Sequence, residues 1–298
     1  MKKIAMYMVA LGALAAYGCS SQEKGDSDFQ WQVDKFADIK ILRYQVPDFD
    51  SLSLGQKKLV FFLSQAALSG RDILWDQNYK YNLAVRRTLE AIYTGYDGDR
   101  TTPNFEKFVT YLKRVWFSNG IHHHYSNEKF IPEFSKEYFA ELVANTPERS
   151  FPKELGTLIE MQSLLVPIIF DPEVARFRVN QTQGVDLVAS SAMNYYEGVT
   201  QKEAEDFYAK MVNPKDTQPI SYGLNSKLVK ENGLVFEKVW KVGGMYSAAI
   251  EKIVYWLQKA EAVAENDIQK QTIRHLIDYL SSFTRLFMTT CLINIFQR

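Results

Sequence analysis

The sequence of 298 residues has few of the residues that make cross-links or bind metals: 2 cysteines and 4 histidines. The cysteines, Cys19 and Cys291, lie near opposite ends of the chain. Because Cys19 falls in a targeting segment, where it is the predicted lipid attachment site, we expect no intramolecular disulfide. A cysteine–histidine nucleophile pair is not indicated, for the same reason. The fold must therefore be stable through packing alone.

An excess of charge of either sign is also missing. The chain has 35 basic and 35 acidic residues and no block of five like charges. Because binding to phosphates requires a basic surface, this balance argues against nucleic acid as the main partner. Hydrophobic residues make up 46% of the chain and aromatic residues 14%, which is typical of a globular protein with one large or two small domains.

Several signatures of catalysis are absent from the sequence. It contains no Walker loop, no Gly-x-Gly-x-x-Gly, no Gly-x-Ser-x-Gly and no His-Glu-x-x-His. Paired carboxylates for acid–base chemistry remain open, because any two of the 35 acidic residues could meet in the fold. That pattern has no specificity.

The longest apolar stretch near the start, at 4–16, is too short to span a bilayer and follows two lysines, as in a signal peptide. Gly18 and Cys19 then resemble a bacterial lipoprotein signal, in which the cysteine is acylated. Ala16 and Tyr17 depart from the usual pattern, so a plain secretory signal is the alternative.

We therefore expect residues 1–19 to be a lipoprotein-type signal and 20–28 to be a polar tether. The predicted location is exported and anchored to a bacterial membrane through Cys19, in the periplasm or facing the surface. A soluble periplasmic protein is the alternative.

The remaining pattern predicts an α+β fold that is predominantly helical, with a few antiparallel strands. Strands do not alternate regularly with helices, which disfavours a doubly wound parallel sheet. The apolar periodicity and the capping residues predict helices at 53–68, 79–93, 102–118, 135–144, 151–170, 200–211, 243–264 and 267–280. Strands are predicted at 38–46, 175–180, 221–230 and 234–241, the last two joined by an Asn-Gly hairpin.

Three of the four histidines stand side by side in WFSNGIHHHY, at 116–125. On an extended segment His122 and His124 would point the same way and could chelate a metal, while His123 would point away. Zinc would need further ligands, and none is near in the sequence. Hydrogen-bonded histidines in a turn or a cleft are the favoured interpretation, and binding of a cationic substrate is a further alternative. His122, His123, His124 and Tyr125 are candidate cleft residues.

Three segments mix aromatic and polar side chains, at 70–79, 194–198 and 223–230. The first is expected to be a packed connection after a helix that ends at Gly70, with the lining of a cleft as the alternative. The second is similar, and the third is expected to be a half-exposed strand.

Several long segments, in this order, resemble the N-terminal part of dipeptidyl peptidase III, a zinc metallopeptidase family, in its Bacteroides-type form. They are ILRYQVP, LSQAALSGRDILWDQNYKYNLAVRRTLE, WFSNGIHHHYS, NYYEGVTQKEAEDFY, GLNSKLVKENG and VWKVGGMYSAAIEKIVYWLQKA. The resemblance implies removal of dipeptides from peptide N-termini, in a cleft between two lobes. It also implies that 29–280 form much of a lower lobe, in which helices accompany a small β-barrel, here incomplete.

In the family, zinc is held in the upper lobe by a His-Glu-x-x-Gly-His type motif, and none of the catalytic residues matches a position here. Residues 281–298 form an atypical tail of the kind that a frameshift produces. We therefore expect a truncated relative that is inactive alone, with no catalytic, cofactor or metal residues of its own. Peptides and, through the lipid, a membrane are the expected partners, and nucleic acid is not. A lipid-anchored peptide-binding protein is the main alternative, and an unrelated enzyme that uses histidine and carboxylates is another.

Overall fold

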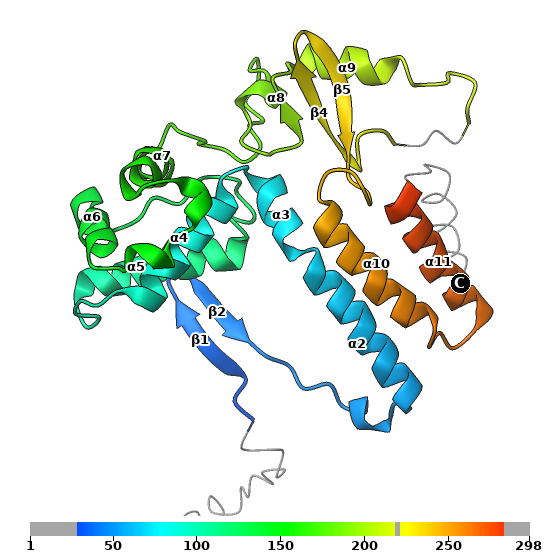
Figure 1. Cartoon of the computed structure of the whole chain (residues 1–298), viewed down its shortest axis with the longest axis horizontal. Coiled ribbons are helices and arrows are strands. Elements are labelled where there is room, and N and C mark those ends of the chain that lie inside the picture. The colour runs from blue at the N-terminus through cyan, green and yellow to red at the C-terminus, as the bar shows by residue number, and fades with distance from the viewer. Residues whose placement is uncertain (1–28, 218–220, 283–298) are drawn as a thin grey trace, which may run out of the picture. The chain divides into compact units, whose positions relative to one another are not determined.

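The computed structural model describes residues 29–217 and 221–282 (Figure 1). The predicted signal, the tether, Cys19 and nearly all of the atypical tail lie outside these residues. The chain divides into two compact units, Met1–Pro47 and Asp48–Arg298.

The described part of the first unit is an antiparallel hairpin of β1 (Gln32–Phe36) and β2 (Ile39–Leu42). The predicted strand at 38–46 corresponds to β2, which is shorter than expected, and its partner β1 was not predicted. Ala37, in the turn, has a φ of 47°, a left-handed conformation that is uncommon for a residue other than glycine.

The second unit consists mainly of helices and carries one three-stranded sheet. Its helices are α2 (Leu54–Ser69), α3 (Arg71–Asn78), α4 (Asn82–Gly95), α5 (Pro103–Ser118), α6 (Lys136–Ala144), α7 (Leu158–Phe170), α8 (Leu187–Ser190), α9 (Gln201–Ala209), α10 (Ser247–Glu261) and α11 (Asp267–Ser282), with short 3-10 turns at Phe49–Ser51, Glu148–Ser150 and Lys153–Leu155. The predicted α+β, mostly helical fold is thus confirmed for the described residues, and neither of their sheets is closed.

The sheet has the strand order β3 (Tyr196–Glu197), β4 (Ser226–Glu231) and β5 (Leu234–Val239). The predicted hairpin between β4 and β5 is confirmed: Asn232 and Gly233 form its loop with φ values of 51° and 81°. Both residues tolerate positive φ, which a two-residue hairpin loop requires. The pairing of β3 with β4 is parallel and was not predicted.

Local capping chemistry sets the helix starts. Thr102 accepts a hydrogen bond from the N–H of Phe105 ahead of Pro103, as predicted for α5. Thr200 and Glu203 form the predicted capping box of α9. The helix predicted at 151–170 is shorter, because a capping box on Thr157 starts α7 at Leu158.

Two other predictions were wrong. Segment 70–79 was expected to be a packed connection between helices, but most of it forms a helix of its own, α3. Segment 175–180 is not a strand, and its β pairing is one isolated bridge between Glu128 and Phe177. Ala175 has a φ of 52°, so the backbone is not extended there.

Buried apolar side chains form three clusters in the second unit. The largest lies among α3 to α7 and includes Phe108 and Phe139, both fully buried. A second joins α2, α10 and α11, and a small third one lies between α9 and the sheet around Leu228. Among the described residues, no helix has the length and apolar character needed to cross a bilayer.

Candidate functional site

His122, in the histidine run, is a buried side chain, only 2% exposed. Its Nε2 lies 2.6 Å from the carbonyl oxygen of Ala175, so this nitrogen must carry the proton and donate. Burial lowers the pKa of His122 from 6.5 to about 4, more than the carbonyl bond raises it. The ring is therefore neutral at pH 7.

His123 lies in the turn that follows. Its Nδ1 accepts hydrogen bonds from the backbone N–H groups of Tyr125 (3.2 Å) and Ser126 (3.1 Å). Its ring stacks on that of His124, with the centroids 4.4 Å apart. Tyr125 is 84% exposed. The favoured interpretation, hydrogen-bonded histidines in a turn, describes these contacts.

These bonds leave little capacity for a metal. The Nδ1 of His123 is engaged by two amides, and the buried ring of His122 is oriented by its carbonyl partner. Among residues 29–217 and 221–282, no three His, Cys, Asp or Glu side chains are grouped so that they could hold a metal ion. The described residues therefore do not fit a zinc centre. A cleft role for the four residues at 122–125 stays a prediction.

Two of the three mixed aromatic and polar segments, 70–79 and 194–198, meet at Asp76, on α3. The amide of Asn194 donates to Asp76 Oδ2 over 2.9 Å, and the hydroxyl of Tyr246 donates to the same oxygen over 2.5 Å. The backbone N–H of Asn194 also donates to the carbonyl of Gln77 over 2.8 Å. One carboxylate thus ties α3 to the segment before β3 and to the start of α10.

Aromatic rings pack together beside the partners of this carboxylate. The ring of Trp240 lies 5.5 Å from that of Tyr195 and 5.8 Å from that of Tyr246. Asn225 holds Trp240 in place through a 2.9 Å bond from its amide to the carbonyl of Trp240. We name this group the Asp76 junction; it comprises Asp76, Asn194, Tyr195, Asn225, Trp240 and Tyr246.

Tyr246 has the least ordinary backbone in the junction, with a φ of 63° at the position that precedes α10. This conformation is strained for an aromatic residue, and the bond to Asp76 helps to hold it. Burial and then the neighbouring Asp76 raise the pKa of the Tyr246 phenol. The phenol therefore stays a hydrogen-bond donor over the whole physiological range. Nothing in the sequence pattern indicated that Trp240 and Tyr246 belong to this group.

Strand β4 is more buried than expected. Its first four residues, 226–229, are buried, so the prediction of a half-exposed strand was wrong. The reason is that β4 is the central strand and has a partner on each side. Lys227 is accommodated by an ion pair with Glu197, which lowers the pKa of that carboxyl.

Strand β5 is an edge of the three-stranded sheet. The N–H of Leu228 donates to Tyr195 on the β3 side, so the residue opposite it on β5 directs its backbone groups away from β4. By the same alternation, the N–H and C=O of Val235 also point outward. Such an edge can pair with another extended chain.

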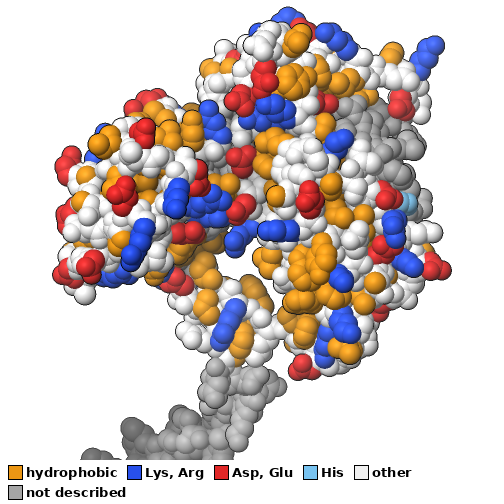
Figure 2. All heavy atoms as spheres, in the orientation of Figure 1, with side chains coloured by type: hydrophobic (Ala, Val, Ile, Leu, Met, Phe, Trp, Pro, Cys, Tyr) orange, Lys and Arg blue, Asp and Glu red, His pale blue; other side chains and the backbone are white. Residues whose placement is uncertain are grey.

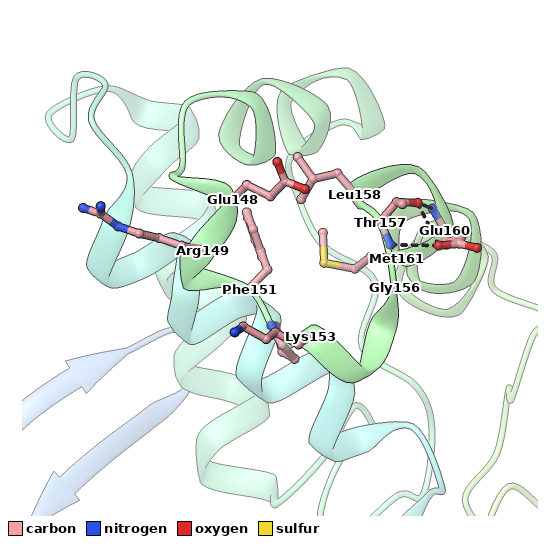
Figure 3. A pocket seen from close by; sticks show the side chains of 10 residues that line it. Glu148, Arg149, Phe151, Lys153, Gly156, Thr157, Leu158, Glu160 and Met161 are labelled. Carbon is pink, nitrogen blue, oxygen red and sulfur yellow. Dashed lines mark hydrogen bonds between the residues drawn. The ribbon is translucent and has the colours of Figure 1, made fainter.

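A depression of about 680 Å³ lies elsewhere, between the 3-10 turns at 148–155 and the start of α7 (Figure 3). It shares no residue with the Asp76 junction. Two carboxylates, Glu148 and Glu160, line it; Glu160 is engaged by Thr157 in the capping box, which lowers the pKa of Glu160. On the face of the molecule in Figure 2, basic and acidic side chains are interspersed.

No family model matches the chain, and no curated protein matches its sequence. Among solved structures, the chain is similar to DPP III from Caldithrix abyssi, with 15% identity and a TM-score of 0.49, over 84% of this chain and 35% of that chain. It is also similar to dipeptidyl-peptidase III from Corallococcus sp. strain EGB, with 13% identity and a TM-score of 0.48, over 84% of this chain and 34% of that chain. The chain thus spans about a third of the length of these proteins.

Proposed function

We propose that this chain is a lower-lobe region of a dipeptidyl peptidase III, of the Bacteroides type, which holds an extended peptide and does not hydrolyse it alone. The order of the family-like segments along the sequence supports the family. The outward-facing edge of β5 is the observation that carries peptide binding. Anchoring through an acylated Cys19 is part of the proposal.

The edge of β5 suits a peptide because backbone groups recognise any sequence. A peptide strand beside β5 would pair with outward groups such as those of Val235, and the main chain would supply most of the affinity. The Asp76 junction is placed to support this edge. Its Trp240 follows β5 directly and packs between Tyr195 and Tyr246.

We expect no hydrolysis because the sequence lacks the residues that would bind the zinc ion. The 298 residues contain no His-Glu-x-x-Gly-His motif, and the four histidines do not stand in a zinc-binding pattern. When bound, zinc would supply an activated water for attack on the peptide carbonyl. The described residues offer no group of three or more His, Cys, Asp or Glu side chains that could bind zinc, so no catalytic step is assigned to them.

Hydrolysis of a dipeptidyl-arylamide by the purified chain, with and without added zinc, tests the catalytic part. We expect no turnover above the uncatalysed rate in either case. Turnover that rises with zinc and falls on chelation would refute this part of the proposal.

Calorimetry with short unstructured peptides tests the binding part. We expect binding that Val235→Pro abolishes, because proline removes an outward N–H while the bonds from β5 to β4 remain. Val235→Ala is the matched control: it trims the side chain and keeps the N–H, so it should retain binding. Equal binding by both variants would exclude the β5 edge. Binding without hydrolysis is also what the alternative, a lipid-anchored peptide-binding protein, predicts.

A further inference from the structure

The hairpin of the first unit carries a group of aromatic rings at its open end. The ring of Trp31 lies 4.7 Å from that of Phe29 and 6.3 Å from that of Tyr44. The guanidinium of Arg43 lies over the ring of Phe29, 4.8 Å from its centroid. Trp31 is 52% exposed and Tyr44 is 75% exposed. We call Phe29, Trp31, Arg43 and Tyr44 the aromatic end of the hairpin.

The aromatic end is held by backbone bonds as well as by ring contacts. The N–H of Arg43 donates to the carbonyl of Trp31 over 2.9 Å, which continues the pairing of β1 with β2 beyond their ends. The Nε of Arg43 donates to the carbonyl of Gln30 over 2.8 Å. The rings are therefore presented to solvent in a fixed arrangement, and little side-chain entropy remains to be lost on binding.

Tryptophan, tyrosine and arginine side chains are favoured at the interface between water and lipid. Their rings prefer the level of the headgroups, with the apolar part toward the acyl chains and the polar tip toward water. Arginine places its stem on apolar surface and its guanidinium among phosphates. Val46, 70% exposed, adds apolar surface just beyond the aromatic end.

We propose that the aromatic end contacts the lipid interface of the membrane that carries the chain. This inference rests on the acylated Cys19 of the proposed function. Residues 20–28 separate Cys19 from Phe29. Even fully extended, this tether spans only about 35 Å, at most about 3.6 Å for each residue. The lipid anchor thus keeps the open end of the hairpin, where the chain enters it, close to the headgroups. The aromatic rings can therefore reach the headgroups without diffusing from bulk solution.

Quenching of tryptophan fluorescence by doxyl-labelled lipids tests the contact. The full-length acylated chain is placed in vesicles of phosphatidylethanolamine and phosphatidylglycerol and compared with Trp31→Phe, which keeps an aromatic ring but removes the reporter. We expect stronger quenching of the unchanged chain, because one of its five tryptophans lies at the interface. Equal quenching of both chains would overturn the proposal. It is also the result expected if these rings bind a protein and not the lipid.

Vesicle flotation of the unacylated chain separates the aromatic end from the anchor. The double variant Trp31→Ser, Tyr44→Ser should partition from water onto the vesicles about tenfold less or weaker still. The reason is that each ring removes apolar surface from water when it enters the interface. Tyr125→Ser, at a residue 84% exposed in the histidine turn, is the control and should leave partitioning unchanged. An equal effect of both changes would contradict the proposal. Mass spectrometry of Cys19 shows independently whether the anchor is present, and circular dichroism shows whether each variant folds.

Discussion

The helical body of α3 to α7 and the sheet of β3 to β5 are stabilised in different ways. The body has a continuous apolar core with many fully buried rings. The cluster beneath the sheet has three buried apolar residues, Val199, Ala204 and Leu228, and the strands are also held by polar ties. One is the Asp76 junction, and another is the bond from Ser226 to Glu237, 2.6 Å long. Apolar burial stabilises the body, whereas the sheet has an edge strand, β5, without a partner strand among the described residues.

The largest expected effect is a cavity in the body. Phe108 is fully buried between Phe105 and Phe134, so Phe108→Ala should lower the free energy of unfolding by about 3–5 kcal/mol. Leu228→Ala, in the small cluster, should cost about 2 kcal/mol, because its surroundings can collapse more easily. Urea unfolding measures both free energies. An equal loss for the two changes would contradict the proposed difference in packing between the body and the sheet.

The second effect is a dependence of the body on pH. Because burial lowers the pKa of His122 to about 4, from 6.5 in the unfolded chain, the unfolded state binds more protons between these values. The free energy of unfolding should therefore fall as the pH drops below 6.5 and level off below about 4. The total loss is about 3 kcal/mol, since each pH unit is worth about 1.4 kcal/mol.

Urea titrations from pH 7 to pH 4 measure this loss, and His122→Gln is the control. The glutamine amide can donate to the carbonyl of Ala175 but does not titrate in this range. A variant with the same pH slope as the unchanged protein would show that His122 is not the group responsible.

A smaller effect is expected at the Asp76 junction. Tyr246→Phe removes the 2.5 Å bond to Asp76 and should destabilise the protein by about 1–2 kcal/mol, because the bond reaches a carboxylate that is partly exposed. Asp76→Asn should cost a similar amount. A double-mutant cycle measures their coupling, which should be clearly non-zero. Tyr195→Phe, whose bond to Gln77 is 3.4 Å long, is the control with little expected change.

The smallest expected effect has the opposite sign. The hydroxyl of Tyr111 is buried in the body and has no hydrogen-bond partner among the described residues. Tyr111→Phe should therefore stabilise the protein by about 1 kcal/mol. Tyr208→Phe, near the sheet, loses a 3.2 Å bond to Glu237 and should destabilise it. Thermal unfolding compares the two variants. A loss of stability in both would contradict the prediction that only the hydroxyl of Tyr208 contributes to stability.

The helices with clear caps were predicted well, and the interruptions between them less well. Segment 70–79 was expected to be a packed connection, because Gly70 correctly suggested the end of α2. In the structure Gly70 has a φ of −89° and passes directly from α2 into α3. The start of α7 was placed too early, because an apolar pattern does not show where a capping box will form.

The candidate site was predicted only in pieces. The mixed segments were recognised separately, but nothing in their spacing showed that 70–79 and 194–198 meet at Asp76. Hydrogen-bonded histidines were the favoured interpretation of the histidine run, with a shared metal as the alternative, but the sequence did not show that His122 is buried and that the chain turns at His123. The burial of Lys227 was likewise missed, because it depends on a partner 30 residues away.

By itself, the sequence determined the features that close within three or four residues. The capping boxes at Thr157 and Thr200, the stop at Asn119 and the loop at Asn232-Gly233 depend on side chains that bond to their own backbone or accept positive φ. The tertiary structure alone decided the contacts between distant segments. Tyr246 and Asp76 are 170 positions apart, so their pairing depends on how the helices and the sheet pack and not on any local preference.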